Sequence, residues 1–186
     1  MSQLNIYADA EPAQATLATA DAAAIARELQ AIGVRFERWQ AAQPVVAGAS
    51  QDEIVAAYRA PIDRMMAEGG YQTVDVISLT PDHPDKVALR QKFLSEHTHS
   101  EDEIRFFVDG QGLFSLHAAG KVFAVLCEKG DLISVPAGMT HWFDMGPAPR
   151  FACIRIFGNP EGWVAKYTGS PIADGFPRID AMVAAA

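Results

Sequence analysis

The chain is organised around one short stretch, EHTHSEDEIRFF, which runs from Glu96 to Phe107. His97 and His99 stand two residues apart, and Glu103 follows four residues after the second histidine. In extended backbone the side chains at i and i+2 share a face, so both imidazoles point the same way. A single bend in the polar residues Ser100–Asp102 would bring the carboxylate of Glu103 to the two imidazoles. Such a set suits Fe(II), Ni(II), Mn(II) or Zn(II), and the plainer interpretation is a solvated acidic loop.

A further candidate ligand is His141, at the end of the segment GDLISVPAGMTH that begins at Gly130. This segment predicts a strand followed by a turn at Pro136 and Gly138. A histidine after such a turn can return to the site from a neighbouring strand, although alone it is more often structural. Together with the earlier pattern, His141 predicts a centre of three imidazoles and one carboxylate.

From residue 96 onward, short segments rich in β-branched and aromatic residues are separated by glycine-containing turns. Closely spaced short strands of this kind are typical of an antiparallel sandwich or closed barrel. This part of the chain is therefore expected to be mainly β. The predicted strands cover residues 104–109, 113–118, 122–127, 132–135 and 151–157.

The N-terminal half combines predicted strands with apolar residues at helical spacing. Strands are expected at 4–7, 34–39 and 74–79, and three helices at 21–32, 50–68 and 86–94. Ser50 and Glu53 form a capping box for the second helix, which Pro61 is expected to break. Residues 11–19 are expected to form a loop, and residues from 179 onward to be disordered.

The composition is that of a globular protein, with 49% hydrophobic and 20% charged residues among 186. The formal net charge of -8 comes without a basic block, which argues against a nucleic-acid partner. No apolar run approaches the ~18 residues that a membrane span requires. The N-terminus lacks the apolar core of an export signal. Cys127 and Cys153 lie in apolar runs, so buried free thiols and a cytoplasmic location are expected.

The two histidine-containing stretches resemble the two signature motifs of the cupin superfamily. The matching positions are His97, His99, Glu103 and Gly110 in the first motif and Gly130, Pro136, Gly138 and His141 in the second. Gln91 replaces the usual glycine of the first motif and Met145 the frequent asparagine of the second, but neither replaces a ligand. The resemblance implies one antiparallel jelly-roll β-barrel domain over residues 1–186. Its helical N-terminal part would cover about 21–94 and its metal-binding core about 96–158.

Longer segments, in the same order and with similar spacing, resemble the bacterial acireductone dioxygenase family. They are VRFERW at 34–39, DVISL at 75–79, KFLSEHTH at 92–99, EIRFFV at 103–108, VLCEK at 125–129, LISVPA at 132–137, HWFDMG at 141–146 and NPEGW at 159–163. The resemblance implies a monomeric enzyme of methionine salvage that cleaves 1,2-dihydroxy-5-(methylthio)pent-1-en-3-one with O2. With Fe(II) the products would be 4-methylthio-2-oxobutanoate and formate, and with Ni(II) 3-methylthiopropanoate, formate and carbon monoxide. One metal ion per chain is implied.

Arg105 is expected to serve this chemistry directly. It stands two residues after Glu103, so on a strand it shares the face of that ligand. From there it can orient the substrate oxygens and favour the substrate dianion by its charge. The alternative is a salt bridge with Glu101 or Asp102. Three imidazoles and one carboxylate leave two octahedral positions open, enough for a bidentate oxygen ligand.

Glu96 and Asp102 each precede a predicted ligand and should point away from the metal. The resemblance implies that Glu96 helps metal incorporation and that Asp102 couples the site to the surrounding structure, while solvated acids remain the alternative. An apolar slot for the methylthio tail is expected from aromatic side chains, each of which also suits the core. They are Phe93, Phe107, Phe143 and Trp163.

Some residues and function classes stay outside the main hypothesis. His83 and His117 are expected to be structural, and residues 159–167 form a candidate lid. Because cupin barrels carry many functions, two other classes remain open. One is a non-catalytic cupin that binds a small molecule, and the other is a metal-dependent isomerase that consumes no O2.

Overall fold

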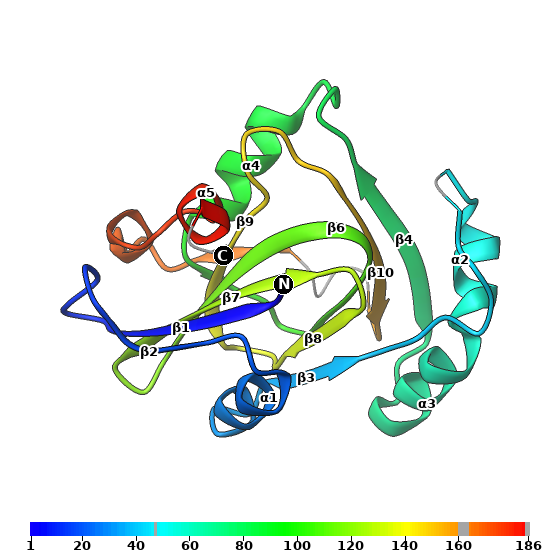
Figure 1. The fold of residues 1–186 in the computed structure, drawn as a ribbon, viewed down its shortest axis with the longest axis horizontal. Helices are drawn as coiled ribbons and strands as arrows, with labels where there is room; N and C mark the ends of the chain where they lie inside the picture. The colour runs from blue at the N-terminus through cyan, green and yellow to red at the C-terminus, as the bar shows by residue number, and fades with distance from the viewer. Residues whose placement is uncertain (47, 160–163, 185–186) are drawn as a thin grey trace.

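The computed structural model describes residues 1–46, 48–159 and 164–184, which form a mainly antiparallel β fold with helices on its outside (Figure 1). The strands are β1 (Gln3–Ala8), β2 (Ala15–Thr19), β3 (Arg35–Arg38), β4 (Thr73–Leu79), β5 (His97–Thr98), β6 (Glu103–Ala118), β7 (Lys121–Glu128), β8 (Asp131–Val135), β9 (Thr140–Asp144), β10 (Phe151–Phe157) and β11 (Lys166–Tyr167). The helices are α1 (Ala22–Gln30), α2 (Gln51–Ala57), α3 (Arg59–Gly69), α4 (Lys86–Leu94), the 3-10 helix η2 (Ile172–Gly175) and α5 (Ile179–Ala184).

Strand β6 belongs to two sheets at once. Its first half pairs with β8 and β10, and its second half pairs with β7 and β9. The order β11-β5-β9-β6-β7-β1-β2 forms one sheet, while β3 and β4 extend the other beyond β8 and β10. The described strands do not close into a ring, which fits the expected jelly roll.

Two glycines allow β6 to pass from one sheet to the other. Gly110 has a φ of 73°, and a Cβ there would lie 1.8 Å from the carbonyl oxygen of Arg150. A Cβ on Gly112 would lie 2.4 Å from the ring of Phe143. Glycine accommodates both the left-handed backbone and the close approach. The expected turn between separate strands at 104–109 and 113–118 was wrong, because the strand bends here without interruption.

The alternation of side chains along β6 separates two cores. Phe107, Phe114 and Leu116 face inward, into the core between the two sheets. Ile104 and Phe106 face outward and pack with α2 and α3 in a second core. Glu103 and Arg105 lie four and two residues before Phe107 on the same strand, so their side chains share its face. Both charged side chains therefore face the interior between the sheets.

The N-terminal half contains four described helices where about three were expected. The predicted second helix divides at Tyr58 into α2 and α3, upstream of Pro61. Pro61 is the third residue of α3, where no backbone N–H is needed for an intrahelical hydrogen bond. The capping box of Ser50 and Glu53 and the predicted range 86–94 are confirmed. No helix of the described residues is long and apolar enough to cross a membrane.

Two segments expected to lack regular structure are ordered by tertiary contacts. The predicted loop at 11–19 contains β2, which pairs with β1. The tail expected to be disordered contains α5, whose Ile179 and Met182 are buried with Trp142 in a third core. Both expectations were wrong. Neither segment has a strong local pattern, and each is ordered by residues distant in sequence, β1 for β2 and the core around Trp142 for α5.

Candidate metal centre

Three histidines meet in the interior between the sheets. His97 lies on β5 directly opposite His141 on β9, and the centres of these two rings are 4.6 Å apart. The ring of His99 lies 5.0 Å from that of His97 and 5.2 Å from that of His141. Their potential ligand atoms all lie within 4.8 Å of one another, and all three residues are buried. One metal ion can therefore contact all three imidazoles.

Glu103 adjoins this cluster at the start of β6. Its Oε2 lies 2.8 Å from Nε2 of His141 and 3.3 Å from Nε2 of His99. Burial raises the pKa of Glu103, but Arg105, His141 and His99 outweigh burial and hold that pKa well below its usual value. The carboxyl is therefore ionised at neutral pH, which is the state that binds a cation.

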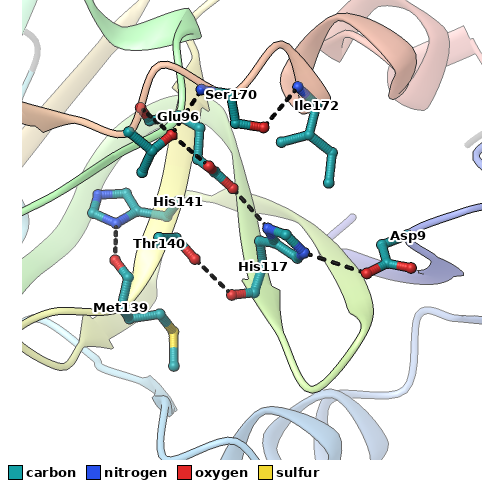
Figure 2. A network of polar contacts seen from close by, with 9 residues as sticks. Asp9, Glu96, His117, Met139, Thr140, His141, Ser170 and Ile172 are labelled. Carbon is teal, nitrogen blue, oxygen red and sulfur yellow. Dashed lines mark hydrogen bonds and ion pairs between the residues drawn. The ribbon is translucent and has the colours of Figure 1, made fainter.

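Backbone carbonyls orient two of the imidazoles. Nδ1 of His97 lies 2.6 Å from the carbonyl oxygen of Ser95. Nδ1 of His141 lies 2.9 Å from the carbonyl oxygen of Met139, a contact that Figure 2 shows. A carbonyl oxygen only accepts, so each Nδ1 carries the proton and Nε2 becomes the ligand atom. Burial, and after it the neighbouring His141, lowers the pKa of His97 to about 4. Neutral imidazoles and an ionised carboxylate are the donor forms that fit a divalent metal ion.

Arg105 shares the inner face of β6 with Glu103, and its Nε donates to Oε1 of that carboxylate at 2.7 Å. Its guanidinium carbon lies 4.9 Å from the ring centre of Phe143, 5.8 Å from that of Phe114 and 5.9 Å from that of Phe93. Aromatic faces attract a cation and keep water away from it. The positive charge of Arg105 is therefore held beside the metal cluster with little solvent screening.

Comparison with known proteins decides the family, because a model of the ARD/ARD' family matches residues 3–165. The chain belongs to the acireductone dioxygenase family. An acireductone dioxygenase from Alcanivorax borkumensis is 59% identical, over 96% of this chain and 98% of that protein. One from Pseudomonas aeruginosa is 57% identical, over 97% and 99% respectively. The solved acireductone dioxygenase from Bacillus anthracis, with a cadmium ion in its active centre, matches with a TM-score of 0.78 and 32% identity, covering 90% of this chain and 98% of that one.

In this member of the acireductone dioxygenase family, a cavity of about 160 Å³ adjoins the metal cluster. Larger hollows of about 340 and 480 Å³ lie elsewhere, but none of the histidines lines them. The cluster of titratable groups identifies the smaller cavity as the site. The described residues that line it are Ile77, Lys92, Phe93, His97, His99, Glu103, Arg105, Phe143, Arg155 and Ala165.

The predicted aromatic wall is only partly present in this cavity. Phe93 and Phe143 belong to the lining, and their rings lie 6.4 Å apart. Phe107 instead packs in the core between the sheets, with its ring 6.3 Å from that of Phe151. Trp163 and part of the candidate lid at 159–167 lie outside the described residues. Arg155, which the sequence patterns did not single out, faces the cavity.

Glu96 is buried and turns away from the metal cluster, as predicted (Figure 2). Its Oε1 lies 2.7 Å from Nδ1 of His117, and its Oε2 accepts a hydrogen bond from Oγ1 of Thr168 at 2.6 Å. On the far side of the imidazole, Nε2 lies 3.6 Å from Oδ2 of Asp9. This network ties the residue before His97 to β6, to the turn that follows β1 and to the C-terminal segment. The contact of Glu96 with His117 joins residues distant in sequence, so no local pattern marked it.

Asp102 also points away from the cluster and joins two other parts of the fold. The hydroxyl of Tyr71 donates to its Oδ2, and the backbone N–H of Ala137 donates to its Oδ1 at 2.9 Å. Burial, and after it the bond to Asp102, raises the pKa of the Tyr71 hydroxyl, which therefore stays protonated. Asp102 thus links the connection before β4 to the loop before β9, next to the predicted ligand Glu103.

Proposed function

We propose that this chain catalyses the O2-dependent cleavage of 1,2-dihydroxy-5-(methylthio)pent-1-en-3-one in methionine salvage. Membership of the acireductone dioxygenase family supports the substrate and the reaction class. The single structural observation that carries the proposal is the buried cluster of His97, His99 and His141 beside the cavity. A purely structural trio of histidines would not need to converge on one point with a carboxylate and a guanidinium.

One Fe(II) or Ni(II) ion per chain would be held by Nε2 of His97 and of His141, by an imidazole nitrogen of His99 and by the carboxylate of Glu103. When bound, such an ion acts as a Lewis acid and as a template for the two oxygens of an enediol. The family resemblance implies 4-methylthio-2-oxobutanoate and formate with Fe(II). With Ni(II) it implies 3-methylthiopropanoate, formate and carbon monoxide.

The side chains of the cavity would prepare the substrate for O2. Arg105 would hold the enediol oxygens by charge-assisted hydrogen bonds and lower their pKa values, which favours the dianion. The dianion is the electron-rich form that reacts with O2. Phe93 and Phe143 would shield Arg105 from water and offer apolar surface to the methylthio tail.

The surrounding residues would support this centre. We assign Glu96 to metal incorporation and Asp102 to coupling between the site and the rest of the fold, in line with the contacts of each. We also propose a monomer in the cytoplasm, and two buried free cysteines are in keeping with a reducing compartment.

Metal-free protein loaded separately with Fe(II) and Ni(II) tests the proposed reaction. Substrate is added in an oxygen electrode, and the products are then identified. Formate is expected with both metals. It should be accompanied by 4-methylthio-2-oxobutanoate with Fe(II) and by carbon monoxide with Ni(II). Conversion without O2 uptake would indicate the isomerase, and substrate that survives unchanged would indicate a non-catalytic cupin. Either result would end the proposal.

A further inference from the structure

A second arginine lies beside Arg105 in the cavity. The register of β10 with β6 places Arg155 directly opposite Arg105, and the register of β10 with β4 places Asp75 opposite Arg155. Directly paired residues project from the same face of a sheet. Asp75, Arg155 and Arg105 therefore form a row across three strands, and Glu103 lies two residues before Arg105 on the same face of β6. Both arginines line the cavity.

Two like charges at directly paired positions destabilise a sheet unless something compensates them. Each arginine here has its own carboxylate. Nε of Arg105 donates to Glu103 at 2.7 Å, while Nε and Nη2 of Arg155 donate to the two oxygens of Asp75 at 2.7 and 2.5 Å. A bidentate pair of this kind fixes the plane of the guanidinium. Arg155 is thus held in a defined orientation beside Arg105, the residue that is proposed to bind the substrate oxygens.

The cavity concentrates positive charge in an acidic protein. Lys92, Arg105 and Arg155 line it, and they face two carboxylates among the described residues, that of Glu103 in the lining and that of Asp75 paired with Arg155. The whole chain, by contrast, carries a formal net charge of -8. A cavity with an excess of cations between low-dielectric aromatic walls attracts anions. The side chain of Arg155 is 27% exposed, so solvent reaches it.

We propose that Arg155 is a second anion-binding residue of this site and that Asp75 positions it. This inference rests on the proposed function, because the anions concerned are the deprotonated enediol of the substrate and the carboxylate of the oxo-acid product. Arg105 and Arg155 would contact such an anion from neighbouring strands. The competing interpretation is that the pair of Arg155 with Asp75 only ties β10 to β4.

Arg155→Gln tests this role, with Lys86→Gln as a control that makes the same change in net charge. Lys86 lies at the exposed start of α4, where its Nζ donates to the carbonyl oxygen of Pro81. KM and kcat are measured over a range of ionic strength with metal-loaded protein. The dissociation constant of 4-methylthio-2-oxobutanoate is measured by calorimetry without O2. Arg155→Gln is expected to raise KM and the dissociation constant by about tenfold, with kcat changed less.

The dependence on salt separates a binding role from a structural one. If Arg155 attracts the anion, kcat/KM of the wild type falls with salt more steeply than that of Arg155→Gln, and Lys86→Gln follows the wild type. Arg155→Lys is expected to keep the steep salt dependence but to lose part of the affinity, because it keeps the charge without the planar fork.

A double variant guards against misfolding. Asp75→Asn with Arg155→Gln replaces the ion pair by two amides that can still hydrogen-bond across the strands, and it is expected to show the same loss of affinity. The proposal is overturned if both variants keep the KM, product affinity and salt dependence of the wild type. Wild-type protein that releases no formate would instead contradict the proposed function, and the calorimetric comparison would still decide whether Arg155 binds the anion.

Discussion

Glu103 is the residue at which the proposed metal site and substrate site meet. One carboxylate oxygen adjoins His99 and His141, and the other accepts from Arg105. The negative charge of this side chain therefore serves a metal ion on one side and holds the substrate-binding cation on the other. A substitution that removes the charge but keeps the shape should affect both functions.

Glu103→Gln is expected to lower metal affinity by at least about tenfold, because it replaces an anionic ligand by a weak neutral one. Alanine at His97, His99 or His141 should do the same. Metal per chain after dialysis against a weak chelator is the measurement. His83→Ala is the control, since His83 lies in the turn before α4 and accepts from the N–H of Asp85. A variant that retains one metal per chain would remove that residue from the ligand set.

Arg105→Ala is expected to keep the metal and to lower kcat about 100-fold, the usual effect of removing one donor from a developing anion. Arg105→Lys should restore only part of kcat, because an ammonium group lacks the planar fork of arginine. Metal content and O2 uptake are measured on the same samples. Normal turnover with full metal content would show that the dianion does not depend on Arg105.

At the scale of elements, the bend in β6 depends on Gly110. Gly110→Ala is expected to destabilise the fold by about 3 kcal/mol, from the left-handed backbone and the clash with the carbonyl of Arg150 together. Gly33→Ala is the matched control, because Gly33 has a φ of 80° and nothing lies within 4 Å of its Cβ position. It should cost about 1 kcal/mol. Urea unfolding of the two variants gives the loss of stability in each. Equal losses would show that the close approach of Gly110 to the carbonyl of Arg150 is unimportant.

Asp144 joins three elements at the end of β9. Its carboxylate accepts from Arg90 on α4 at 2.8 and 3.1 Å, and from the backbone N–H groups of Gly146 and Ile179, the latter at the start of α5. Burial raises the pKa of Asp144, but these donors outweigh burial and hold the pKa below its usual 3.8. Asp144→Asn should lower the free energy of unfolding by about 2 kcal/mol. The loss is smaller than for a fully buried ion pair, because the side chain of Arg90 is partly exposed.

The contribution of Asp144 should depend on pH with a defined sign. A carboxyl whose pKa is lower in the folded state stabilises the fold above its unfolded pKa, and this contribution disappears as the pH falls through the folded pKa. The difference in unfolding free energy between wild type and Asp144→Asn should be complete above about pH 5 and shrink in more acidic solution. A difference that grows on acidification would contradict the assignment.

At the scale of the whole molecule, the periodicity of the sequence predicted those strands and side-chain directions that depend on residues close together in the chain. The parity of a strand placed Arg105 on the face of Glu103, and apolar alternation identified most of the long strands. β5 and β11 have only two residues each, and α5 depends on Asp144 and on a distant core, so no local pattern could define them. Arg155 lies in a segment that is apolar on both faces. A single charge in such a run is the local feature that could have marked it.

The most direct test of the proposed centre is formate release under O2, titrated against the Fe(II) bound per chain. If His97, His99, Glu103 and His141 form one catalytic site, the initial rate rises in proportion to bound Fe(II) and stops rising at one equivalent. His97→Ala should then remain inactive at every loading. Formate released at the full rate by metal-free protein, or a rate that keeps rising beyond one equivalent, would contradict a single three-histidine, one-glutamate centre.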